Sequence, residues 1–245
     1  MGGPGRRPAS SSGLEAIAGQ LSEAVSKLDF GEPVSVVYNP LDYARGAHAE
    51  YLERFGGRRG VALLLGMNPG PWGMAQTGVP FGEVAAVRDW MQIRAAIGKP
   101  DPEHPKRPVQ GLECQRSEVS GARLWGWARE QFGDPEAFFA RFFVWNYCPL
   151  SFMVESGANL TPDKLARAER DALYQPCDRA LVEVVDALEP SMVIGIGKFA
   201  ETRARRVLGD GVPIGTVLHP SPASPIANRG WAPQADKQLR ELGVL

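Results

Sequence analysis

The chain has 245 residues, and its 27 basic and 28 acidic side chains give a formal net charge of −1 at pH 7. This balance supplies no global attraction to nucleic acid, so any phosphate binding requires a local basic patch. The length fits one α/β domain, and the 3 cysteines, which have no paired short spacing, argue against a disulfide framework and against a zinc or iron–sulfur site.

The N-terminal residues predict a flexible tail that precedes a single domain. Residues 1–13 are rich in glycine, proline and serine and include two arginines, so they bury too little apolar surface to become ordered. They hold no secretory signal, and no apolar run in the chain approaches the roughly 18 residues of a membrane helix. We expect a tail at 1–13, a domain at 14–245, and a soluble protein of a reducing cytoplasm without membrane contact.

Four short apolar runs predict the strands of a parallel sheet. They cover residues 61–67, 142–148, 191–197 and 213–219. A helical pattern at 83–97, a helix start at 161–163 and a second helical pattern at 181–188 separate the runs, as crossovers between parallel strands do. We expect a single α/β domain whose central four-stranded parallel sheet has helices on both faces, with a proline-rich surface loop at 98–111.

The first run leads directly into an irregular loop, residues 66–82. Five glycines and three prolines in these 17 residues fix a non-repetitive backbone that presents Asn68 and Phe81 outside any regular element. An Asn before a proline commonly starts a turn, and a Phe most often packs in a core. The complete loop at a strand end favours a ligand-binding position for both.

Polar side chains follow all four predicted strands. They are Asn68, Asn146, Lys198 and His219. Because ligands bind beyond the carboxyl ends of parallel strands, we expect these four side chains to share one crevice. The first loop lacks the Gly-Lys-Ser/Thr ending of a nucleotide-hydrolysing loop, and the glycines at 195 and 197 lack the carboxylate of a dinucleotide site. We expect neither a cofactor nor a metal.

Five segments of the chain resemble the single-strand-selective monofunctional uracil-DNA glycosylases. They are GMNPGP at 66–71, QTGVPFGE at 76–83, EVSGAR at 118–123, NYCPL at 146–150 and HPSP at 219–222. The resemblance covers about residues 30–232, is that of a bacterial-type member, and has its motifs at the predicted strand ends. It implies the uracil-DNA glycosylase fold and hydrolysis of the bond between a damaged base and deoxyribose, once the base has rotated out of any duplex.

The resemblance also implies roles for individual residues. Asn68 matches the residue that orients water, and His219 matches the group near uracil O2, so these two are the expected catalytic residues. The expected substrate-binding residues are Met67, Gly70, Phe81 and Asn146. Phe81 corresponds to the ring on which uracil stacks, and Asn146 to the amide that pairs with uracil N3–H and O4 and rejects cytosine. Gly70 leaves the pyrimidine 5-position open, so 5-hydroxymethyluracil is an expected substrate.

The segment 219–228 is expected to wedge into the duplex in place of the flipped base. Ala223 stands where relatives often carry a basic residue, which leaves the preference between single-stranded and duplex DNA open. Expected DNA contacts are Lys198, Ser221, Pro222, Ser224, Asn228 and Arg229. The family forms no covalent imine, so the product is an abasic site and the process is base-excision repair.

The expected partner is uracil-containing DNA, single-stranded or duplex, bound by a monomer at the nucleoid of a bacterial cytoplasm. Three alternatives to this activity stay open. They are a glycosylase that prefers deaminated purines, a non-catalytic module that binds damaged DNA, and a hydrolase of free nucleosides.

Overall fold

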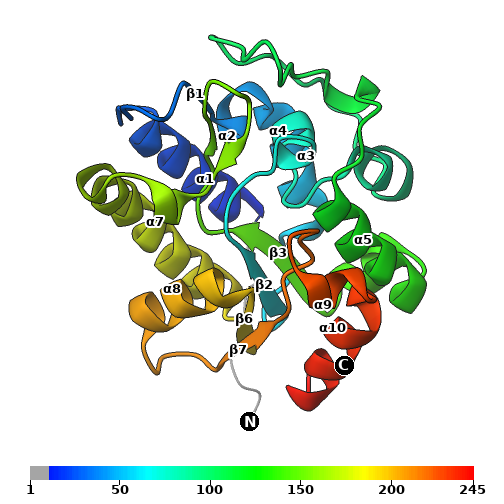
Figure 1. Cartoon of the computed structure of the whole chain (residues 1–245). Coiled ribbons are helices and arrows are strands. Elements are labelled where there is room, and N and C mark those ends of the chain that lie inside the picture. Colours follow the sequence, from blue (N-terminus) through cyan, green and yellow to red (C-terminus); the bar gives the residue numbers. More distant parts are fainter. Residues whose placement is uncertain (1–10) are drawn as a thin grey trace.

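Four parallel strands form the central sheet, in the order β3-β2-β6-β7 (Figure 1). The computed structural model describes residues 11–245. The strands are β2 (Ala62–Gly66), β3 (Phe142–Asn146), β6 (Met192–Ile196) and β7 (Ile214–Val217). Each lies inside one of the four predicted apolar runs, so the expected sheet is confirmed.

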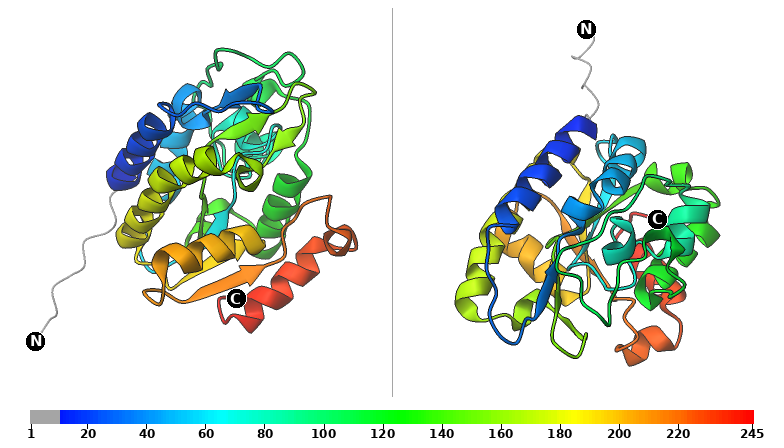
Figure 2. Two further views of the ribbon diagram at one scale, coloured as in Figure 1. Left: turned by 60° about the vertical axis from the view of Figure 1, so that its left-hand side comes forward. Right: turned by 90° about the horizontal axis from the view of Figure 1, so that it is seen from above.

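The strands are almost free of charged side chains because helices cover both faces of the sheet. The α-helices are α1 (Ser11–Val25), α2 (Pro40–Tyr43), α3 (Arg45–Phe55), α4 (Met74–Thr77), α5 (Val119–Phe132), α6 (Pro135–Phe139), α7 (Arg167–Leu188), α8 (Lys198–Leu208), α9 (Pro225–Asn228) and α10 (Trp231–Glu241). Helices α1, α7 and α8 lie on one side of the sheet, and α5 and α10 lie on the other (Figures 1 and 2). The expected α/β arrangement is therefore confirmed.

A second, antiparallel sheet was not predicted. It has the order β1-β4-β5, with β1 at Val36–Tyr38, β4 at Ser151–Met153 and β5 at Asn159–Leu160. Strands of two or three residues are too short to show an alternating pattern in sequence. The small sheet lies beyond the carboxyl end of β3 and holds the segment that enters α7.

The predicted helix at 83–97 is wrong in its second half. A short π-helix covers Ala86–Trp90, and Gln92 then takes a positive φ of 56°. Beyond this point the backbone N–H groups of Arg94 and Ala95 donate to Glu50 Oε2 on α3, at 3.0 and 2.9 Å. The side chain of another helix thus replaces the carbonyl partners that a continuing helix would supply.

Two other boundaries differ from expectation. Pro162–Lys164 is a single 3₁₀ turn whose preceding Thr161 makes no side-chain cap, and α7 begins only at Arg167. Of the expected tail, residues 1–10 lie outside the described residues, while Ser11–Gly13 form the first turn of α1. The proline-rich loop expected at 98–111 forms neither helix nor strand up to residue 110, and a 3₁₀ turn, Gly111–Glu113, begins at its last residue. Within residues 11–245, none of the helices has the length and apolar character needed to cross a bilayer.

Candidate active site

A cleft of about 550 Å³ lies beyond the carboxyl ends of the parallel strands. Its walls come from the loop after β2, the start of α5, the segment after β4 and the loop after β7. It brings together seven residues expected at the site, namely Met67, Asn68, Gly70, Phe81, His219, Ser221 and Pro222. The irregular loop at 66–82 is therefore one wall of a cavity, and the cleft is called the catalytic cleft below.

Asn68 is held by its amide nitrogen. Its Nδ2 atom donates to the carbonyl of Leu150 at 3.1 Å and lies 3.4 Å from the carbonyl of Pro69. Only the NH₂ end of the amide can meet two carbonyl oxygens, so this pair fixes which way the side chain points. The Oδ1 atom is left as an acceptor in the catalytic cleft, where it is suited to receive a hydrogen bond from a water molecule.

His219 is held as a neutral imidazole with a defined tautomer. The backbone N–H of Ser221 donates to its Nδ1 at 3.0 Å, so Nδ1 is an acceptor and the ring proton is on Nε2. Burial lowers the pKa of His219 to about 4 because the charged form loses solvation. Across neutral pH the ring therefore presents an N–H donor without a positive charge.

The Phe81 ring stands beside His219, with 6.1 Å between ring centroids and 45° between ring planes. The Phe81 backbone has a φ of 53°, a left-handed conformation that strains a bulky residue. Its carbonyl accepts hydrogen bonds from Trp125 Nε1 at 3.0 Å and from the Glu83 N–H at 2.7 Å. These contacts hold the ring in place before any ligand is present.

Gly121 on α5 is the close neighbour that this arrangement requires, since a Cβ there would overlap the Phe81 carbonyl. We expect Gly121→Ala to destabilise the protein by about 1–3 kcal/mol, as overpacking against backbone does, and to lower activity by shifting Phe81. Gly126, on the same helix, has nothing within 4 Å of an added Cβ. Gly126→Ala is therefore the matched control, expected to stabilise by about 0.5–1 kcal/mol. Denaturant unfolding measures both, and equal effects would contradict the packing argument.

Asn146 lies at the edge of the Phe81 ring rather than in the wall of the catalytic cleft. The side chain is 5% exposed, its Oδ1 has no hydrogen-bond partner, and its Nδ2 lies 3.2 Å from Met74 Sδ. Both Oδ1 and the Phe81 ring lie over Gly66, whose missing side chain makes room for them. The amide oxygen is thus an unpaired buried acceptor beside the Phe81 ring.

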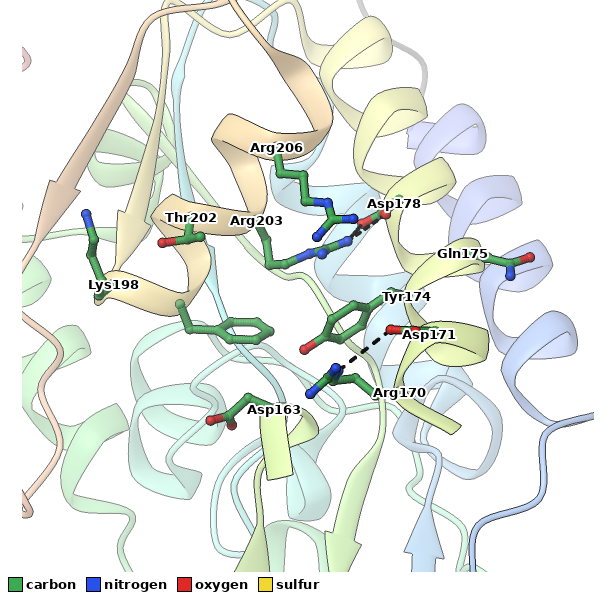
Figure 3. A pocket seen from close by; sticks show the side chains of 11 residues that line it. Asp163, Arg170, Asp171, Tyr174, Gln175, Asp178, Lys198, Thr202, Arg203 and Arg206 are labelled. Carbon is green, nitrogen blue, oxygen red and sulfur yellow. Dashed lines mark hydrogen bonds and ion pairs between the residues drawn. The ribbon is translucent and has the colours of Figure 1, made fainter. Parts of the chain in front are cut away.

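Lys198 does not share this crevice, contrary to expectation. It is the first residue of α8, its side chain is 82% exposed, and it pairs with Glu201 at 2.9 Å. It borders a separate cavity of about 620 Å³ between α7 and α8, where Arg203 pairs with Asp178 (Figure 3). The strand-end rule placed the residue at the correct edge of the sheet, but the helix directs its side chain away from the catalytic cleft.

The segment after His219 forms an exposed loop with internal bonds. The Ser224 hydroxyl caps α9 by accepting from the Ala227 N–H at 3.3 Å. Asn228 uses both ends of its amide, since Nδ2 donates to the Pro222 carbonyl and Oδ1 accepts from Arg123. Ile226 is 54% exposed. Among the residues of this segment that were expected to contact DNA, Asn228 therefore uses its side-chain amide for hydrogen bonds within the protein.

Sequence reasoning missed two residues that shape the site and the contacts of a third. Arg123 ties α5 to the loop after β7 through the carbonyls of Pro220 and Ser221 and through Asn228. Trp72 lies on the cleft wall, and the guanidinium groups of Arg107 and Arg116 lie over its ring. Their Cζ atoms are 5.2 and 4.6 Å from the ring centroid. Sequence shows neither contact, because each joins segments far apart in the chain.

The second missed residue, Glu118, fills the space beside Gly70 that was expected to be open. A methyl group added at Gly70 would overlap the Glu118 carboxylate. Its burial, and then the nearby charge of Glu83, raise the pKa of Glu118 to about 7. The carboxyl group is thus a feature of the same wall. Among residues 11–245, no cluster of three or more His, Cys, Asp or Glu side chains is arranged to hold a metal ion.

Comparison with known proteins agrees with this geometry. The family model "Uracil DNA glycosylase superfamily" matches residues 55–240. A protein of Rattus norvegicus named "Single-strand selective monofunctional uracil-DNA glycosylase" is 49% identical over 257 residues, covering 99% of this chain and 92% of its own. A Mus musculus protein of the same description is 51% identical over 229 residues, covering 92% of this chain and 82% of its own. The crystal structure of wild-type Pedobacter heparinus SMUG2 is similar in fold, with a TM-score of 0.65, 17% identity, and coverage of 93% of this chain and 97% of that one.

Proposed function

Because the chain belongs to the uracil-DNA glycosylase superfamily, and within it to the single-strand selective monofunctional uracil-DNA glycosylases, we propose that it hydrolyses the N-glycosidic bond of uracil in DNA. The reaction releases the base and leaves an abasic site, the first step of base-excision repair. Whole-length similarity to proteins named for this activity supports the reaction. The geometry of Asn68 and His219 in one cleft is the observation that carries the mechanism.

Cleavage of the glycosidic bond leaves positive charge on the sugar and negative charge on the departing uracil. We propose that the Nε2–H of neutral His219 donates to uracil O2, where that negative charge gathers, so the bond strengthens in the transition state. Asn68 Oδ1 orients water toward the sugar. An amide is a weak base, but a sugar with the character of a cation needs little activation of its nucleophile.

Base recognition follows from the groups around Phe81. Uracil stacks on the ring, and the unpaired Oδ1 of Asn146 accepts from N3–H while Nδ2 donates to O4. Cytosine presents an acceptor at N3 and a donor amino group at C4. The amide oxygen would then face an acceptor and the amide nitrogen a donor, so neither hydrogen bond could form. Rejection of the normal base therefore depends on one side chain at the edge of the platform.

The contacts that we propose for DNA lie around the mouth of the catalytic cleft. Ser221 and Pro222 belong to the loop after β7 and line the cleft, and Arg229 directly follows α9. Lys198 borders the separate cavity between α7 and α8 and pairs with Glu201, so it is not among these contacts. Both single-stranded and duplex DNA are proposed substrates.

We also propose that the protein acts as a monomer, because the proposed catalytic and base-binding residues all come from one chain. A location in the cytoplasm of a bacterium, at the nucleoid, is consistent with three free buried cysteines and a DNA substrate.

The function is tested with single-stranded and duplex oligonucleotides that carry one uracil. We expect strand breaks only after alkali treatment, which cleaves abasic sites, and free uracil in the supernatant. Breaks without alkali would indicate lyase activity, and binding without breaks would indicate a non-catalytic module. Free deoxyuridine as substrate distinguishes a nucleosidase, which would release uracil from it.

A further inference from the structure

The cavity between α7 and α8 is as large as the catalytic cleft. Its volume is about 620 Å³, against about 550 Å³ for the cleft, and it is called the α7–α8 groove below. The proposed hydrolysis of uracil uses none of its side chains. A cavity of this size accommodates a ligand as large as a nucleotide, so the chemistry of its lining decides which ligand it fits.

The α7–α8 groove has a surplus of positive charge. Its basic side chains come from both helices (Figure 3). Counted with their ion-pair partners, the lining residues include six basic and four acidic side chains, and every one of the acidic side chains is paired. Arg206, by contrast, is exposed and has neither an ion pair nor a side-chain hydrogen bond within residues 11–245. The groove is therefore a local basic patch in a chain of nearly neutral charge, and Arg206 is free to bind an anion.

Two aromatic rings lie beside these charges. Phe199 on α8 and Tyr174 on α7 line the α7–α8 groove, and their ring centroids are 6.2 Å apart. Both residues are partly exposed. Arg203 holds this wall together, because its Cζ atom lies 4.1 Å from the Tyr174 centroid while its guanidinium group pairs with Asp178. The groove thus presents aromatic rings in fixed positions next to an unpaired cation.

The α7–α8 groove adjoins the catalytic cleft at two points. Before α7, Thr161 lines the cleft and Asp163, two residues later, lines the groove. After β6, a Cβ added at Gly197 would lie 3.0 Å from the Cβ of His219, and the next residue borders the groove. A DNA strand with one nucleotide in the cleft can therefore place a neighbouring nucleotide in the groove.

We propose that the α7–α8 groove binds single-stranded DNA next to the uracil, with a phosphate at Arg206 and a base stacked on Phe199, in addition to the contacts at the mouth of the catalytic cleft. This inference rests on the proposed function. Proteins that bind single strands combine a basic groove with aromatic side chains, since every base has a face that can stack. The bases of a duplex are already paired and stacked on one another. The groove therefore stabilises the complex with a single strand more than the complex with a duplex.

The first test concerns stacking. Phe199→Leu keeps an apolar side chain but has no aromatic face. We expect it to lower kcat/KM on a single-stranded oligonucleotide with one central uracil by about 5- to 10-fold, toward the lower end of the effect of one stacked base. The fall should lie in KM rather than kcat, because the groove lies outside the cleft that holds the reacting bond, and it should be smaller when the same oligonucleotide is in a duplex.

The second test concerns the phosphate. Affinity for a uracil-free single strand, measured by fluorescence anisotropy at several salt concentrations, reports on the groove without catalysis. Arg206→Gln should reduce the slope of log affinity against log salt concentration by about 0.7, the share of one phosphate on single-stranded DNA. Arg179→Gln is the matched control, because Arg179 is exposed on α7 and lines neither cavity.

Thermal unfolding of each variant confirms that it is folded. Equal salt slopes for Arg206→Gln and Arg179→Gln, or falls of equal size on single-stranded and duplex DNA in Phe199→Leu, would overturn the assignment. Absence of uracil excision by the unmodified protein would instead reject the proposed function, while the anisotropy measurement still decides whether the groove binds a single strand.

Discussion

Replacement of Asn68 by alanine is expected to lower kcat on uracil-containing DNA by about 10²–10³-fold, the range found when one positioned polar group is removed from an active site. The reason is geometric. Two carbonyls hold the Asn68 nitrogen, so its oxygen has a fixed direction in the catalytic cleft. Alanine removes the acceptor that orients water but leaves Phe81 and His219 in place. Single-turnover rates of uracil release measure this effect separately from product dissociation.

The Asn68→Ala variant should remain folded and keep its affinity for DNA. The substitution also removes the bond to the Leu150 carbonyl, so a modest fall in melting temperature is expected, and it is measured in parallel. Gln131→Ala truncates an exposed amide on α5 and serves as the control. A single-turnover rate for Asn68→Ala within a few fold of the Gln131→Ala rate would show that Asn68 does not orient the water.

Replacement of His219 by alanine is expected to reduce kcat by about 10²–10³-fold through loss of the donor to O2. His219→Gln, which restores an N–H donor at a similar distance from the backbone, should recover part of that loss. The binding of free uracil should change less than the rate, because the donor acts mainly on the charge that develops as the bond breaks. Equal rates in the alanine and glutamine variants would argue against hydrogen bonding as the role of this side chain.

We expect His219 to stay neutral between pH 8 and pH 5.5, and this charge state can be measured directly. Burial lowers its pKa to about 4, so the ring is neutral above about pH 5, and lowering the pH from 8 to 5.5 should not protonate it. NMR titration of the imidazole resonances is practicable because the chain has only 3 histidines. A pKa at or above the ordinary value of about 6.5 would mean that a charged imidazolium acts on the leaving group instead.

Sequence patterns located the sheet and the edge where the site lies, because buried parallel strands need continuous apolar runs and their carboxyl ends converge. That rule and the resemblance to a known family predicted that Asn68 and His219 share one crevice, and both line the same cleft. The direction in which a side chain points could not be predicted from sequence. Lys198 follows a strand end as Asn68 does, yet as the first residue of α8 it borders another cavity.

Contacts between distant segments were also beyond the reach of sequence. Glu118 precedes a helix, which in sequence gives it the appearance of an ordinary first-turn acid. Its place in the cleft wall became visible only from its position against Gly70, 48 residues earlier in the chain. The same holds for the end of the helix predicted at 83–97, which depends on the Glu50 carboxylate of α3. In both cases a contact between distant segments decided what the local pattern could not.

Helix α5 joins three parts of the site within two turns. Glu118 lies at its N-cap position, Gly121 lies under the Phe81 carbonyl, and Arg123 binds the loop that follows His219. Under the proposed function, a bound DNA strand that displaced Arg123 would also shift the Phe81 ring and the cleft wall at Glu118, because a helix moves as a rigid unit. Strand binding and base choice are then thermodynamically linked, each altering the free energy of the other by the same amount. A preference among 5-substituted bases that differs between single-stranded and duplex DNA is the expected sign of that linkage.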